Sequence, residues 1–155
     1  NADWHTYPKI AWNQTGSYFG MVYERGNEVY FARATETGSL AGADLNLSQS
    51  GTDDANGSRF PNMTQRGAWL HVVWQEGDDI NNDSDDFTIS YAYVNEFGAI
   101  AQGPLPVAQA GTITPNGLFS GQVAPAYNSN DDNMGLVWSQ YYAAEANKDV
   151  YLVRY

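Results

Sequence analysis

The chain has 155 residues, of which 7 are Lys or Arg and 18 are Asp or Glu, giving a formal net charge of −11 at pH 7. A surface this negative repels phosphate backbones and anionic lipid, which argues against nucleic-acid binding and membrane-surface roles. There is no cysteine, so disulfide bridges, zinc-thiolate sites and a thiol nucleophile are excluded. Aromatic residues make up 14% of the chain, which favours a folded β protein over a disordered chain.

The first part of the chain is predicted to form four strands, at residues 7–12, 18–24, 29–33 and 43–48. The dipeptide Gly26–Asn27 lies between the second and third strands. Both residue types tolerate a positive φ, so this dipeptide predicts a tight hairpin. In the fourth segment Leu45 and Leu47 alternate with polar residues, which indicates an outer strand with one exposed face.

The same order of elements recurs twice further along the chain. The second set of predicted strands lies at residues 60–63, 69–75, 87–94 and 103–109. Pro104 and Pro106 mark its last strand as an edge, because proline cannot donate to a central ladder. The third set lies at residues 123–127, 134–140 and 149–155. No fourth strand is predicted for this last set.

Three short apolar runs that each end in a large aromatic residue anchor the repetition, at Tyr23, Trp74 and Trp138. A proline precedes each anchor at a similar distance, at Pro8, Pro61 and Pro125. The aromatic residues at repeat positions are expected to pack between neighbouring units. They are Trp12, Tyr23, Trp74, Tyr127 and Trp138. Self-similarity over several short strands is typical of propeller blades or a related all-β array.

This order of proline, strand, glycine turn, aromatic-ended strand and further strand resembles the blade repeat of bacterial secreted β-propellers, from Pro8 to Tyr155. The resemblance implies an all-β fold of antiparallel propeller blades in one domain, 1–155, with units at roughly 7–51, 59–111 and 122–155. It also implies a secreted, periplasmic or extracellular location. It favours a lectin-like or glycan-active module, since propellers host lectins, hydrolases and docking scaffolds. The sialidase box Ser-x-Asp-x-Gly-x-x-Trp is missing from the sequence, which argues against a sialidase-like module.

Three blades are fewer than the roughly four to eight that close a propeller. We therefore expect a homo-oligomer, a dimer that forms six blades; a longer polypeptide or a second chain would complete the ring equally well. A β-sandwich built from the same repeats is the alternative fold. The chain begins with Asn1 and not with Met, which indicates a mature or excised piece.

An acidic segment at residues 77–86 carries the candidate metal ligands. These are Asp78, Asp79, Asp83, Asp85 and Asp86. Carboxylate and amide oxygens are the ligands that Ca²⁺ prefers, and it takes about six to eight of them. The spacing does not follow the EF-hand loop, so a solvated acidic loop is the alternative to a calcium site.

Four aromatic residues outside the repeat positions are the candidate ligand-binding residues. They are Trp4, Trp69, Tyr141 and Tyr142. An aromatic ring covers the apolar C–H face of a sugar while nearby polar groups bind its hydroxyls. An interface role, or an ordinary exposed aromatic, is the alternative for each of them.

The sequence assigns no catalytic residue. Its histidines are His5 and His71, and the second lies on a predicted core strand, where a packed side chain is expected and not a base. The favoured hypothesis is a non-enzymatic recognition module that binds carbohydrate or a protein partner through propeller loops, with Ca²⁺ as the candidate cofactor. The alternatives are a glycan-active hydrolase using Asp or Glu on the propeller face, and a structural domain that assembles with its own copy.

Overall fold

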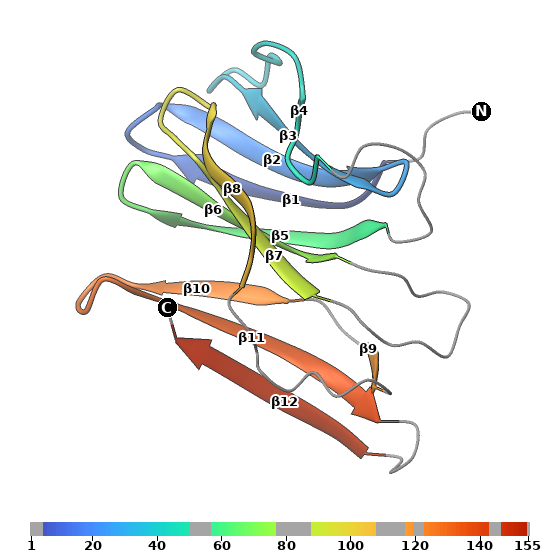
Figure 1. Ribbon diagram of the computed structural model, residues 1–155. Coiled ribbons are helices and arrows are strands. Elements are labelled where there is room, and N and C mark those ends of the chain that lie inside the picture. The colour runs from blue at the N-terminus through green and yellow to red at the C-terminus, as the bar shows by residue number, and fades with distance from the viewer. Residues whose placement is uncertain are drawn as a thin grey trace.

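The computed structural model describes residues 5–49, 57–76, 88–107, 117–119, 123–142 and 147–154. Within these ranges the chain forms twelve β-strands and no helix. The strands make three antiparallel sheets that lie one above another (Figure 1). None of the described residues belongs to a helix long and apolar enough to cross a membrane. The predicted fold class, all-β with antiparallel blades, is confirmed.

The first sheet is a meander in which each strand pairs with the next along the chain. Its strands are β1 (His5–Asn13), β2 (Tyr18–Arg25), β3 (Glu28–Ala34) and β4 (Leu45–Asn46). Gly26 and Asn27 have φ angles of 59° and 64°, as a type I′ hairpin requires. The tight hairpin predicted there is confirmed. The outer strand is shorter than predicted: beyond β4, the amide of Leu47 still donates to the carbonyl of Val29 at 2.8 Å, but no further ladder forms.

The second sheet has the same order of strands. It contains β5 (Ser58–Arg66), β6 (Trp69–Glu76), β7 (Thr88–Val94) and β8 (Ile100–Pro106). Among the described strands, β8 pairs with β7 alone, so the edge position predicted from Pro104 and Pro106 is confirmed. It begins earlier than the predicted strand at residues 103–109, and residues 108 and 109 lie outside the described ranges.

The third sheet contains β9 (Gly117–Phe119), β10 (Ala124–Asn128), β11 (Asn133–Tyr142) and β12 (Asn147–Arg154). Strand β12 pairs along one edge of β11, while β10 and β9 pair with successive parts of its other edge. Together β9 and β10 therefore act as one interrupted first strand. The first strands of the other sheets carry a bulge at the matching place, where Tyr7 and Phe60, each with a φ of 52°, precede prolines.

The sheets pack face to face because both faces of the middle sheet are apolar. On β6, Leu70, Val72 and Trp74 join the core shared with the first sheet, whereas Val73 joins the core shared with the third. This alternation is the period of two that a strand imposes on its side chains. Trp74 and Trp138 are 0% and 2% exposed, so their predicted core positions are confirmed. Trp12 and Tyr23 are only half-buried, so the prediction of core packing is wrong for these two.

The first strands of the sheets lie together, since β5 contacts both β1 and β10. In Figure 1 the strands β1, β5 and β10 lie one below another through the stack. The outward faces of the first and third sheets have no covering sheet among the described residues. Ile10 on the first and Leu152 on the third are 64% and 76% exposed. The described structure is a stack of blade-like sheets with two open ends.

Candidate functional site

A pocket of about 390 Å³ opens at one end of the gap between the second and third sheets. We call it the inter-sheet pocket. Its lining residues are Arg66, Gly67, Ala68, Trp69, His71, Tyr93, Tyr127 and Asp132. Three aromatic rings, a histidine and an Arg–Asp pair thus converge from both sheets.

The hairpin between β5 and β6 positions one wall of the pocket. Its turn has two residues, and Gly67 at the first of them has a φ of 57°. Glycine at this position is what a type II′ hairpin requires. The turn sets Arg66 directly opposite Trp69 in the ladder. The Trp69 side chain shares the face of β6 that looks toward the third sheet, and the residue is 40% exposed.

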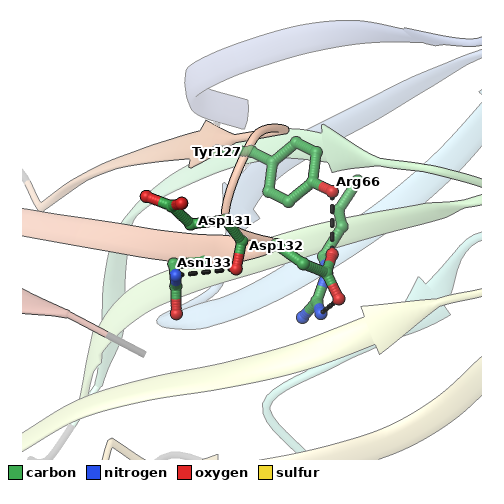
Figure 2. A network of polar contacts seen from close by, with 5 residues as sticks. All are labelled: Arg66, Tyr127, Asp131, Asp132 and Asn133. Carbon is green, nitrogen blue, oxygen red and sulfur yellow. Dashed lines mark hydrogen bonds and ion pairs between the residues drawn. The ribbon is translucent and has the colours of Figure 1, made fainter.

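The turn between β10 and β11 positions the facing wall and is held by its own polar side chains. The Asn128 amide Nδ2 donates to Asp131 Oδ2 at 3.0 Å, and its Oδ1 accepts from the backbone N–H of Asn130 at 3.0 Å. Asn133 Nδ2 donates to the carbonyl of Asp131 at 2.8 Å (Figure 2). The last turn residue, Asp132, has a φ of 55°, which aspartate tolerates better than most residues. Its carboxylate is thereby fixed at the pocket.

An ion-pair network crosses the pocket, and Figure 2 shows Arg66 and Tyr127 both turned toward Asp132. The Arg66 guanidinium donates from Nε to Asp132 Oδ1 at 2.9 Å and from Nη2 to Oδ2 at 2.5 Å. The Tyr127 hydroxyl donates to Asp132 Oδ1 at 2.8 Å. The hydrogen bonds from Arg66 and Tyr127 hold the pKa of Asp132 below its usual value. Asp132 is therefore an ionised acceptor at neutral pH, and its charge balances that of Arg66.

His71 lies at the floor of the pocket and is 3% exposed. Its ring centroid is 4.3 Å from that of Tyr93. Burial lowers the pKa of His71 to about 4, and the positive charge of Arg66 acts in the same direction. The imidazole is therefore neutral at pH 7. Its Nδ1 atom is buried and has no hydrogen-bond partner among the described residues.

The corresponding end of the gap between the first and second sheets is filled. There the Tyr18 hydroxyl donates to the carbonyl of Asn95 at 2.8 Å and accepts from Asn13 Nδ2 at 3.2 Å. The same Asn13 amide donates to the carbonyl of Ala68 at 2.9 Å. The pocket between the second and third sheets therefore does not follow from the blade stacking alone. It depends on the residues at that end of the gap.

Of the ligand-binding residues predicted from the sequence, Trp69 lies in the inter-sheet pocket. Trp4 lies outside the described residues, as do the side chains of Tyr141 and Tyr142, whose backbone belongs to β11. The predicted metal ligands also lie outside the described residues. They are Asp78, Asp79, Asp83, Asp85 and Asp86. Elsewhere in the described ranges, no three His, Asp or Glu side chains are grouped as metal ligands, so calcium binding stays a prediction.

Besides His71, four polar or aromatic residues of the pocket have no predicted role in binding from the sequence. They are Arg66, Tyr93, Tyr127 and Asp132. Tyr127 has a repeat position that predicts core packing, yet it lines the pocket. Asp132 belongs to an acidic run of the kind that is usually only solvated. One signal does point here: His71 pairs with strand β5 at the register position that Gly20 and Gly135 hold in the other sheets.

A second polar group lies near the Gly26–Asn27 hairpin, at the other end of β2. Burial raises the pKa of Glu24, while the charge of Arg59 and the backbone N–H of Phe60 oppose the shift. In the described part of the chain, one carboxylate oxygen of Glu24 is buried without a hydrogen-bond partner. A raised pKa is one requirement of a general acid. A glycosidase also needs a second carboxyl group about 5 to 9.5 Å away, so Glu24 by itself does not define a catalytic site.

No protein-family model matches the sequence. No curated protein matches it either.

Solved structures do share the fold. The GH43B protein of a Bacteroides ovatus xyloglucan locus (PUL) superposes with a TM-score of 0.61 and 10% identity, over 98% of this chain and 30% of that one. The GH43 protein BlXynB from Bacillus licheniformis superposes with a TM-score of 0.57 and 11% identity, over 95% of this chain and 28% of that one. The chain thus spans less than a third of the length of either protein. At these identities the likeness concerns architecture, and this chain has the fold of part of a β-propeller.

Proposed function

We propose that this chain is part of a glycan-active hydrolase of the propeller type and that it binds carbohydrate in the inter-sheet pocket. Two structures with a similar fold are named as GH43 proteins, a class of glycoside hydrolases. The single observation that carries the proposal is the lining of the pocket, in which aromatic rings surround a few fixed polar groups. Pockets of this kind are typical of small-molecule sites.

The lining offers both kinds of contact that a sugar needs. The rings of Trp69, Tyr93 and Tyr127 are flat apolar surfaces suited to the C–H face of a pyranose or furanose ring. The Asp132 carboxylate accepts hydrogen bonds, and its partner Arg66 donates them, so together they match hydroxyl groups. The Arg66–Asp132 bonds also fix both side chains before a ligand arrives, which lowers the entropy cost of binding.

A recognition module without catalysis is the second candidate. It is favoured by the state of Asp132, the carboxylate that lines the pocket, which is ionised and accepts hydrogen bonds from Arg66 and Tyr127. Such a group is suited to accepting hydrogen bonds and is poorly suited to donating a proton to a leaving group. The inter-sheet pocket therefore supports binding, and hydrolysis would use carboxyl groups elsewhere on the propeller.

The test measures binding and hydrolysis on the same sample. Isothermal titration with neutral plant cell-wall oligosaccharides is expected to detect binding, and W69A is expected to weaken it about tenfold or more, because stacking area is lost. F97A is the matched control, since Phe97 is 72% exposed and does not line the pocket. Release of reducing ends supports the hydrolase, whereas binding without release supports the recognition module. If no oligosaccharide binds, or W69A binds like the wild type, the pocket proposal is wrong.

A further inference from the structure

The two outward faces of the stack repeat the faces that are packed against each other inside it. We call the outward face of the first sheet, which carries Ile10 and Tyr23, the head face, and the outward face of the third sheet, which carries Val137 and Leu152, the tail face. We propose that the head face of one chain packs on the tail face of a second copy of this chain. The inference goes beyond the proposed function and does not depend on it, because the residues of the inter-sheet pocket lie on other surfaces.

The tail face is recognised by a pair of apolar residues that recurs in every sheet. In each, a valine of the second strand lies directly opposite a large apolar residue of the third strand. The pairs are Val22–Phe31, Val73–Tyr91 and Val137–Leu152. Phe31 and Tyr91 are 1% and 9% exposed, because the next sheet along the chain covers each of them, whereas Leu152 is 76% exposed. The third sheet therefore presents the face that the first and second sheets bury.

The head face repeats the face with which the second and third sheets receive the sheet before them. Trp74 and Trp138 lie on that face in their sheets and are buried there. Tyr23 holds the equivalent position in the first sheet and is half-buried. Ile10 is 64% exposed, whereas Met63, at the equivalent position of β5, is 9% exposed. The first sheet therefore presents an apolar face of the kind that a preceding sheet covers.

A second copy of the chain is the occupant that this repetition favours. In stacked repeats, each unit buries its apolar face against a neighbouring unit. The contact between the first and second sheets already joins a face of the tail type to a face of the head type. Each chain has one uncovered face of each type among its described residues, so a copy in the same orientation supplies the matching face. A contact between two different patches is heterologous, and used on both faces it closes a ring of two chains.

The charged side chains on the two faces do not oppose this contact. On the head face, Arg25 pairs with Asp44 at 3.3 Å. On the tail face, Arg154 lies 3.9 Å from Asp131. Two copies with a formal net charge of −11 each repel one another at long range. Salt at about 0.15 M screens this repulsion beyond roughly 8 Å, so association is expected to strengthen as salt is added.

The experiment measures the mass in solution, by light scattering in about 0.15 M salt, of the wild type, I10E, L152E and an equimolar mixture of the two variants. Each variant alone should have the mass of one chain, because both contacts of its ring would contain a glutamate. The mixture should recover twice 17.1 kDa, because the unaltered tail face of I10E meets the unaltered head face of L152E. L40E is the matched control and should behave as the wild type, because Leu40 is 70% exposed and lies between β3 and β4.

Recovery in the mixture separates the head-to-tail contact from other arrangements. If two head faces or two tail faces packed together, one of the two variants would still associate by itself, and this result would overturn the proposal. A wild type that stays at 17.1 kDa would overturn it as well.

A second measurement does not depend on the glutamate variants. The chain has no cysteine, so I10C and L152C each carry a single thiol. Both thiols should react with a maleimide more slowly at high than at low protein concentration, because association covers both faces. Protection of one thiol alone, or of neither, would contradict the head-to-tail contact.

Discussion

Asp132 determines the charge of the inter-sheet pocket, because it alone among the described lining residues balances Arg66. In D132N the guanidinium keeps its charge and loses its anionic partner. We expect the affinity for acidic oligosaccharides to rise relative to neutral ones, because Arg66 is then free to pair with a ligand carboxylate. Titration calorimetry with both ligand classes measures the ratio.

The fold should tolerate D132N, because exposed ion pairs contribute little to stability. D131N is the control, since Asp131 lies in the same turn but does not line the pocket. An unchanged ratio in D132N, or an equal change in D131N, would contradict the charge assignment.

His71 makes stability depend on pH. The ordinary pKa of histidine is 6.5, and the pKa of His71 in the folded protein is about 4. Between pH 4 and pH 6.5 the unfolded chain therefore takes up a proton that the folded chain does not. The contribution of His71 to stability is therefore fully present above pH 6.5 and is lost as the pH falls toward 4. When the pH is lowered from 7 to 4.5, the free energy of unfolding measured in urea should decrease by about 2 kcal/mol more in the wild type than in H71N.

Subtracting the two proteins isolates His71, since the surrounding groups titrate in both. The nearest of them are Arg66, Asp132, Tyr93 and Tyr127. Equal losses in wild type and H71N would show that the imidazole is not desolvated in solution.

Gly20 and Gly135 hold equivalent positions in their sheets. Gly20 faces the tight gap between the first and second sheets, whereas Gly135 faces the open end of the stack. A Cβ on Gly20 would lie 2.3 Å from Leu70 Cδ1 and 2.9 Å from Phe31 Cε2, whereas the nearest atoms to a Cβ on Gly135 lie 3.8 and 3.9 Å away. G20A should destabilise the protein by about 1–3 kcal/mol through overpacking. G135A should change stability by about 0.5 kcal/mol or less. Urea unfolding of the pair checks this, and equal effects would contradict the stacking of the first and second sheets.

Among single elements, those that depend on local chemistry could be predicted from the sequence, whereas those that depend on pairing with a distant strand could not. The Gly26–Asn27 hairpin and the proline-marked edge strand β8 follow from φ preferences and missing N–H donors, which a sequence states directly. The short strand β9 (Gly117–Phe119) could not be predicted, because its pairing with Tyr142 and its neighbours depends on a partner strand far along the chain. The predicted outer strand at residues 43–48 shrank to Leu45–Asn46 for a related reason. The length of this strand depends on how many of its residues pair with β3, and the alternation of leucines does not predict that number.

Among the described residues, the first and third sheets each have one uncovered face, and this makes association the expected state of the isolated chain. Ile10 and Leu152 project from these faces with 64% and 76% of their surface exposed. We predict a mass of twice 17.1 kDa in light scattering, because a second copy would cover both faces.

The variants I10E and L152E should restore the mass of one chain, since a buried unpaired carboxylate opposes association. Wild-type chains that run at 17.1 kDa at all concentrations would contradict the dimer.

Export of the protein stays a prediction, which fractionation of the source cells would check.

The sequence by itself determined the all-β antiparallel class, the order of the strands other than β9, the tight hairpin and the buried aromatics Trp74 and Trp138, because alternation, turn residues and repetition act over a few positions. It also singled out Trp69 as a candidate ligand-binding residue. Only the tertiary structure decided that Trp69 meets Tyr93, Tyr127, His71 and the Arg66–Asp132 pair in one pocket. These groups come from two sheets, and which faces meet depends on how whole sheets pack against each other. Local sequence patterns do not determine that packing.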